Sequence, residues 1–345
     1  MTLKTVAKHI GLSPATVSLV LNRSPVANSI PAETQERVFR AARELNYRPN
    51  FMARSLRSQR SYSIGVLVPD ISENYAAGVM SGIEAHLLRE GFFYLVASHR
   101  SKPDLLERYL NLLRDRSVEG FILVATPIDH PTGLPTVAVA GHQKLEQVKN
   151  VLLDHDRAAE LALRHLRELG HERIAFFKGH PHSSDTEDRW ASIHLKAAEL
   201  DLTIDPNLCL QLSGDPEMIF SPEDGYLEGY AFGQALLERG SDFTALFAFN
   251  DVSAIGAMRA FRDAGLRIPE DVSVVGFDDI QIAAFHNPGL TTVRQPLREM
   301  GESAGRLVLE QLAGQNGARD FFTVEPELVV RGTTGPPRAL RRKKT

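Results

Sequence analysis

Short, nearly continuous apolar runs recur along most of this sequence, and they constrain its fold more than any other feature. They begin at Ile64 and are separated mostly by segments whose apolar residues have helical spacing. The runs read IGVLV, FYLVAS, GFILVA, TVAVA, NVLLD, RIAFF, LCLQL, ALFAF and VSVVGF. Such runs are typical of parallel strands that are buried on both faces. The body is therefore predicted to be a doubly wound α/β fold, and its length fits two sheets better than one. FTVEPELVV is expected to add a last pair of strands.

The N-terminal segment has a different pattern, which predicts three short helices. Ser13 is a good N-cap and Pro14 fits the first helical position, so one helix begins in SPATVSLVLN. A preceding helix in LKTVAKHIGL ends at Gly11, and a third is indicated by PAETQERVFRAARELNY. The first two helices with their tight turn could equally form an ordinary helical hairpin in a core.

The distribution of charge favours a second interpretation, in which the helical hairpin binds DNA. The first 60 residues hold 10 lysines and arginines against 3 acidic residues, a net charge of +7, whereas the remainder holds 29 against 40, a net charge of -11. A small basic unit on an acidic body is the footprint expected of a DNA-binding protein. The basic stretch RPNFMARSLRSQRSYS that follows reads as a linker or a helix of marginal stability.

The sequence lacks the usual signatures of disulfide-linked, metal-binding, secreted, membrane, nucleotide-binding and hydrolase proteins. The single cysteine, Cys209, excludes an internal disulfide, and we expect no metal and no cofactor. No signal peptide and no membrane span is expected, so the predicted location is the cytosol. The chain lacks G-x-G-x-x-G after the first strand, G-x-x-x-x-G-K-[ST] and G-x-S-x-G.

Two further motifs favour structural roles. His180 and His182 in GHPHSS have no carboxylate cluster beside them, so an exposed loop is favoured over a metal site. Gly225, Gly229 and Gly233 form a stripe of small residues that indicates close helix packing rather than a phosphate site.

Polar residues just past two strands suggest a ligand site, because open α/β sheets bind ligands at the carboxyl edge. Asn250 and Asp251 follow ALFAF, and Asp278 and Asp279 follow VVGF. Carboxylates and amides suit a ligand rich in hydroxyls, although each residue alone is more often a helix cap.

Three more residues complete this predicted small-molecule cleft. Arg189 opens an expected helix after RIAFF and could supply a bidentate fork. Tyr75 and Phe220 would be aromatic plates.

Several motifs together resemble the lactose-repressor/galactose-repressor family of transcriptional regulators, over residues 2 to about 334. TLKTVAKHIGLSPATVSLVLN resembles its helix-turn-helix, and LNYRPNFMARSL its third-helix end and hinge. LGHERIAFFKG, IGAMRAFRDAGLRIPEDVSVVGFDD and PGLTTVRQP are similar to its body signatures. The resemblance implies a repressor, not an enzyme, with a three-helix headpiece and a two-lobed periplasmic-binding-protein-like (type I) body. It also implies a nucleoid-associated homodimer that binds palindromic operator DNA under the control of a small-molecule effector, most simply a sugar.

The resemblance implies four parts of the chain. These are a headpiece at 1–47, a hinge at 48–61, an effector-binding and dimerisation domain at 62–335, and a basic disordered tail at 336–345. The first lobe is expected to comprise 62–158 and 292–320, and the second 159–290 and 322–335, with crossings near 157–160, 288–293 and 319–323.

The resemblance also implies residues that contact DNA. Pro14, Ala15 and Leu19 match the variable base-reading positions, and Leu19 cannot make the bidentate guanine contact of an arginine. Leu56 matches a hinge leucine that wedges into the minor groove. The other expected DNA-binding residues are Thr5, Ser13, Thr16, Ser18, Asn22, Thr34, Asn50, Ala53 and Arg54.

The same likeness supports the predicted effector cleft. Arg189, Asn250 and Asp278 match positions that hydrogen-bond sugars in many members, and Tyr75 and Phe220 match aromatic contacts. The sequence departs from the family at 74–76, where Asn-Tyr-Ala replaces the usual Pro-Phe-Phe, and at 140–141, where Ala-Gly stands in place of an acid. The first-lobe side of the cleft is therefore expected to be smaller or to recognise a different substituent.

Two alternatives share the body fold. A stand-alone sugar-binding protein of the transport type needs a signal peptide and has no basic headpiece. This sequence shows the opposite: no signal peptide is expected, and its N-terminal helices are basic. A sugar-modifying enzyme needs a paired acid and base, and no such pair stands at a recognisable spacing.

Overall fold

The protein forms two compact units, Met1–Ser61 and Tyr62–Thr345. The computed structural model describes residues 1–22, 24–47, 60–141, 144–181, 183–212, 224–240, 242–315, 317 and 319–338. Most of the expected hinge and the end of the expected tail, 48–59 and 339–345, lie outside these residues. No helix in the described ranges is both long enough and apolar enough to cross a bilayer.

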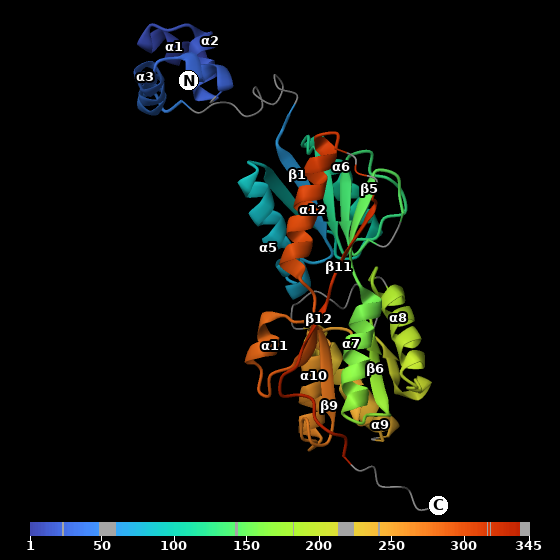
Figure 1. Cartoon of the computed structure of the whole chain (residues 1–345). Coiled ribbons are helices and arrows are strands. Elements are labelled where there is room, and N and C mark those ends of the chain that lie inside the picture. Colours follow the sequence, from blue (N-terminus) through green and yellow to red (C-terminus); the bar gives the residue numbers. More distant parts are fainter. Residues whose placement is uncertain are drawn as a thin grey trace, which may run out of the picture. The chain divides into compact units, whose positions relative to one another are not determined.

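The first unit is the predicted bundle of three α-helices (Figure 1). Its elements are α1 (Leu3–Ile10), α2 (Pro14–Leu21), the short 3-10 helix η1 (Pro25–Ser29) and α3 (Ala32–Glu44). Gly11 ends α1 with φ of 70°, which only glycine adopts without strain. The Ser13 hydroxyl then begins α2 by accepting a hydrogen bond from the Thr16 amide at 3.0 Å. The buried core contains Val6, Ala7, Val17, Val20, Val38 and Ala41.

The second unit begins with the first of two six-stranded sheets (Figure 1). Its strands are β1 (Ser63–Val68), β2 (Phe93–Ser98), β3 (Gly120–Val124), β4 (Thr136–Val139), β5 (Val148–Leu153) and β11 (Phe321–Val324). They are all parallel, in the order β11-β5-β4-β3-β1-β2. Helices α5 (Asn74–Arg89) and α12 (Leu297–Leu312) cover one face, and α6 (Pro103–Asp115) covers the other.

The second sheet has the same architecture with one reversed edge. Its strands are β6 (Ile174–Lys178), β7 (Cys209–Gln211), β8 (Ala245–Phe247), β9 (Ser273–Asp278), β10 (Thr291–Arg294) and β12 (Glu327–Val329). In the order β12-β10-β9-β8-β6-β7, only β12 is antiparallel to its neighbour. Helices α7 (His155–Glu168) and α8 (Thr186–Glu199) cover one face, and α9 (Asp224–Arg239) and α10 (Asp251–Asp263) the other. The remaining short helices are η2 (Pro206–Leu208) and α11 (Gln281–Phe285).

The chain passes between these two lobes three times, at positions that correct the expected lobe boundaries. It enters α7 at His155, runs from β10 to α12 through 295–296, and runs from β11 to β12 through 325–326. Because β10 pairs with β9 and β11 pairs with β5, residues 291–294 belong to the second lobe and 321–324 to the first. FTVEPELVV does contain the two predicted strands, β11 and β12, but they do not pair with each other, because they join different sheets.

The predicted glycine stripe is a helix contact. A Cβ added at Gly229 would overlap the backbone of Ser253, and one at Gly233 would lie 3.0 Å from Cα of Ala257. Both partners lie on α10, so the glycines allow α9 and α10 to approach with backbones nearly touching.

Candidate functional site

A cavity of about 160 Å³ lies between the two lobes of the second unit. This volume is roughly ten times the minimum that holds one water molecule, so the cavity accommodates a small molecule. Tyr75, Arg189, Asn250 and Asp278, which were predicted as effector-binding residues, all line it. The fifth, Phe220, lies outside the described residues.

Arg189 is held rigidly in the second-lobe wall. Its guanidinium carbon lies 4.3 Å from the ring centre of Phe249 and 3.7 Å from that of Phe277. Its Nη1 donates to the carbonyl oxygen of Phe249 at 2.7 Å, and its Nη2 donates to Asp185 at 3.2 Å. Stacking and hydrogen bonding together fix the plane of the guanidinium before any ligand binds.

Asp278 occupies the end of β9 with φ of 110°, an unusual backbone conformation for a residue other than glycine. Its Oδ1 accepts a hydrogen bond of 2.6 Å from Nε2 of Gln295. Burial raises the pKa of Asp278 to about 7, although Arg189 and the Gln295 hydrogen bond act in the opposite direction. Its carboxyl group therefore titrates near neutral pH.

Asn250 combines the two roles considered for it. Its Oδ1 caps α10 by accepting from the Ser253 amide at 2.8 Å, and the side chain also lines the cavity. Because the cap uses only the oxygen, the amide nitrogen is available as a donor.

The first-lobe wall contains residues that follow β1. Asp70, Ser72, Glu73 and Asn74 lie there beside Tyr75, whose buried hydroxyl has no hydrogen-bond partner in the described structure. Glu73 is an exposed residue, but it lines the cleft, and desolvation there together with the charges of Asp70 and Asp278 raises its pKa to about 7.

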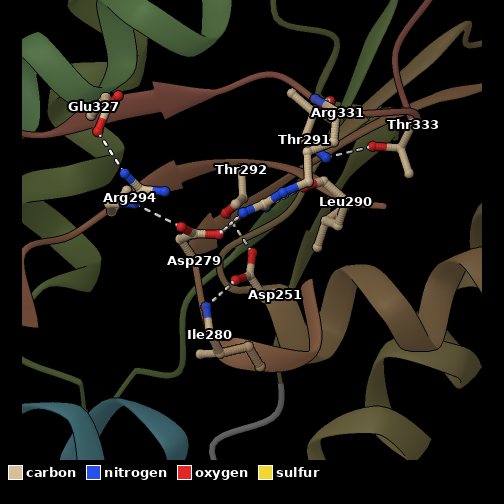
Figure 2. Close-up of polar contacts among 10 residues, drawn as sticks. All are labelled: Asp251, Asp279, Ile280, Leu290, Thr291, Thr292, Arg294, Glu327, Arg331 and Thr333. Atoms are coloured by element: carbon tan, nitrogen blue, oxygen red, sulfur yellow. Dashed lines mark hydrogen bonds and ion pairs between the residues drawn. The ribbon is translucent and has the colours of Figure 1, made fainter. Parts of the chain in front are cut away.

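Asp251 follows a strand end but does not line the cavity. It is fully buried, and its two oxygens accept from the amide of Ile280 at 2.8 Å and the hydroxyl of Thr292 at 2.5 Å (Figure 2). Burial raises its pKa well above the ordinary value. Asp251 therefore joins α10 to the loop after β9 and to β10.

Asp279 also serves a structural network rather than the cavity. Its carboxylate accepts from Nε of Arg294 at 2.7 Å and from Nη2 of Arg331 at 2.6 Å (Figure 2). Arg294 in turn donates to Glu327 at 2.7 Å. These ion pairs connect Asp279, the neighbour of the cavity residue Asp278, to β10 and β12, beside two of the interlobe crossings.

Sequence reasoning missed several residues of the cavity wall. They are Asp70, Glu73, His180, Asp185, Glu228, Phe249 and Gln295. The expectation of an exposed loop at His180 was wrong, because its side chain is mostly buried and lies 3.6 Å from Glu228. His182 lies outside the described residues.

Two of the three predicted base-reading residues are exposed on the surface of the first unit. Pro14 and Ala15 are exposed at the start of α2, whereas Leu19 is partly buried. The Asn22 amide is occupied by Ser18, to whose carbonyl oxygen it donates at 2.8 Å. The expected hinge contacts Asn50, Ala53, Arg54 and Leu56 lie outside the described residues.

The other predicted DNA contacts that the structure describes are Thr5, Ser13, Thr16, Ser18 and Thr34. Thr5 on α1 and Ser13, the N-cap of α2, are exposed, and the remaining three are partly buried. The Thr5 hydroxyl lies 2.9 Å from that of Thr2, the N-cap of α1.

A helix-turn-helix unit joined to a two-lobed domain with an interlobe cavity defines a ligand-regulated DNA-binding protein. Three family models match the chain: bacterial regulatory proteins of the lacI family at residues 2–50, periplasmic binding proteins and sugar binding domain of the LacI family at 61–200, and a periplasmic binding protein-like domain at 163–334. The chain belongs to the LacI family of transcriptional regulators, which confirms the resemblance and the predicted fold.

Relatives and solved structures agree with this assignment. The transcriptional repressor PurR of Haemophilus influenzae is 32% identical over 340 residues, covering 96% of this chain and 97% of the relative. A lac repressor dimer bound to operator and the anti-inducer ONPF has a TM-score of 0.84 and 27% identity, covering 97% of this chain and 99% of the other. The cellobiose complex of the regulator CelR has a TM-score of 0.71 and 29% identity, covering 96% and 99%. The chain is a DNA-binding transcriptional repressor regulated by a small molecule in its ligand domain, and members of its family are not enzymes.

Proposed function

We propose that a homodimer of this chain binds a palindromic operator and that a sugar or sugar derivative between the lobes changes its operator affinity. The observation that carries this proposal is the interlobe cavity, which brings together four residues predicted separately from the sequence. We further propose that the protein acts in the cytoplasm, at the nucleoid.

The DNA-binding part of the proposal rests on α2. Pro14 and Ala15 are exposed at its N-terminal end, the part of a recognition helix that contacts base edges in the major groove. With Leu19 as the third reading position, contacts to thymine methyl groups would replace a bidentate guanine contact. The lac repressor dimer with operator, similar over almost the whole chain, supports this mode.

The effector part of the proposal assigns a role to each of the five residues predicted from the sequence. Arg189, Asn250 and Asp278 would donate to and accept from ligand hydroxyls, with Tyr75 and Phe220 packing on the sugar ring. The sugar complexes of relatives, with cellobiose and ribose, support this class of ligand. Binding would shift the equilibrium between two lobe arrangements, and the three crossings would transmit the change.

A thermal-shift screen of the purified protein tests the effector. The library contains sugars, sugar phosphates, polyols and nucleobases, and a ligand at 100 times its Kd adds about 2.7 kcal/mol of stability. A ligand whose shift is lost in Asp278→Ala, and which changes the affinity of the wild-type protein for operator DNA, supports the proposal. A ligand that shifts the unfolding temperature of Asp278→Ala equally would exclude this residue from ligand binding.

The hinge is tested with operators selected in vitro from random DNA. Leu56→Gly should weaken binding to the selected operator far more than binding to non-specific DNA at the same salt concentration, because only the kinked operator accepts the leucine wedge. Equal losses on both DNAs would remove the wedge from the proposal.

A further inference from the structure

We propose that the effector is an amino sugar whose protonated amine binds between Glu73 of the first lobe and Asp278 of the second. The inference rests on the proposed function, because it names the chemical class of ligand for the same cavity. It follows from the charge and the hydrogen-bonding capacity of the cavity wall.

The cavity wall carries more carboxylates than cations. Among the lining residues that the structure describes, the acidic ones are Asp70, Glu73, Asp185, Glu228 and Asp278, against one arginine and one histidine. Arg189 is already paired with Asp185 at 3.2 Å, and His180 lies 3.6 Å from Glu228. These ion-pair contacts of Arg189 and His180 are therefore with Asp185 and Glu228, not with Glu73 or Asp278.

Glu73 and Asp278 are left without an ion pair in the described structure, and they influence each other across the cleft. The Glu73 side chain has no hydrogen-bond partner among the described residues, and Asp278 uses only Oδ1, toward Gln295. Two carboxylates that face one cavity repel each other when both are ionised, and a cation between them removes that repulsion.

Gln295 supplies an independent observation. It is 3% exposed and lines the cavity, and its Nε2 is bound to Asp278 while its Oε1 has no partner among the described residues. A buried acceptor without a donor is costly, so this oxygen indicates a missing donor. Glu73, Asp278 and Gln295 thus offer three acceptor groups, and an ammonium group carries three N–H donors and no acceptor. A sugar hydroxyl donates only one hydrogen bond.

The pH dependence of binding follows from the groups around this position. Glu73 faces Asp70 and Asp278, while Asp278 faces Arg189, Asp185 and Gln295. Both carboxyl groups have a pKa of about 7, so below pH 7 protons compete with the amine. Each carboxyl group becomes roughly eight times more ionised from pH 6 to pH 7.5, so affinity for an amino sugar should rise by about that factor for each carboxylate that must be ionised to bind the amine.

The test uses the full-length protein and three matched sets of compounds. D-glucosamine, D-galactosamine and D-mannosamine are each compared with the parent hexose and the N-acetyl derivative, by thermal shift and then calorimetry at pH 7.5. At least one amine should bind tenfold or more tightly than both of its neutral partners. Glu73→Gln should remove most of that preference, whereas Glu90→Gln, the same change at the opposite, exposed end of α5, should retain it.

The proposal is overturned if no amine in the three sets shifts the unfolding temperature, if a parent hexose binds as tightly as its amine, or if Glu73→Gln keeps the full preference. These results are distinguishable from failure of the proposed function. A neutral sugar that changes operator binding would leave that function intact and refute only the amine, whereas an amino sugar that binds without changing operator affinity would refute the regulation.

Discussion

Replacing Asp278 by asparagine should stabilise the unliganded protein, and increasingly so as the pH rises. Asparagine keeps the size of the side chain, tolerates positive φ, and can still accept the hydrogen bond from Gln295. What it removes is a carboxyl group that burial disfavours in its ionised form.

The size of the effect follows from the pKa of Asp278, about 7 in the folded protein against an ordinary value of 3.8. Between these values the unfolded chain releases the proton while the folded chain retains it, so folding loses about 1.4 kcal/mol per pH unit. The cost is about 1.5 kcal/mol at pH 5 and reaches about 4 kcal/mol at pH 7 and above. The advantage of Asp278→Asn should therefore grow by about 3 kcal/mol from pH 5 to pH 8.

Urea unfolding followed by tryptophan fluorescence measures this difference. Trp190 is the single tryptophan of the chain and lies on α8, packed edge-on against Phe176 of β6, so it reports on the lobe that contains Asp278. The free energies of unfolding of wild type and Asp278→Asn are compared at pH 5 and pH 8 without ligand.

Asp271→Asn is the matched control in the same lobe. Hydrogen bonds from Arg267 lower the pKa of Asp271 to about 2, so its stabilisation is complete above pH 4 and is lost only as the pH falls toward 2. This variant should be less stable than wild type by the same amount at pH 5 and pH 8. An Asp278→Asn difference that is equally constant over this range would refute the reasoning.

Three further substitutions test the packing. Gly82→Ala places a methyl group on the carbonyl of Arg298 and should cost about 1 to 3 kcal/mol of stability in urea unfolding, whereas the exposed neighbour Ser81→Ala should cost nothing measurable. Val17→Ala should remove about 2 kcal/mol from the small first unit and lower its calorimetric transition alone; an equal drop in the second unit would contradict independent cores. Asp279→Asn should lower the free energy of unfolding by about 2 to 3 kcal/mol, less than for a fully buried pair because Arg294 is partly exposed. An unchanged urea midpoint at pH 7 would show that solvent screens both ion pairs.

Much of the fold could be predicted because the short apolar runs alternate with segments of helical spacing, as buried parallel strands and their connecting helices do. β10 escaped prediction because Thr291–Arg294 contains two threonines and an arginine, so only Val293 adds an apolar side chain to the core, and the buried Thr292 hydroxyl and Thr291 amide bond to Asp251 and Thr333 instead. The lobe boundaries were misplaced because a local run shows that a strand exists but not which sheet it joins.

The candidate site was predicted in part from the expectation that open α/β sheets bind ligands at the carboxyl ends of their strands. Asn250 follows β8 and Asp278 ends β9. Asp70 and Glu73 lie after β1 in the same way, so they could have been found. Gln295 follows β10, which the pattern did not reveal. Glu228 lies within α9 and reaches the cavity only through packing of the second lobe.

The interleaving of the two lobes also sets the order in which the protein can become functional during synthesis. Each sheet obtains an edge strand from the stretch 321–329, with β11 completing the first and β12 the second. The three helices of the first unit are contiguous and leave the ribosome about 280 residues earlier. A nascent or prematurely terminated chain thus has its DNA-binding helices complete while neither sheet is, so assembly of the effector-responsive part waits for synthesis of residues 321–329.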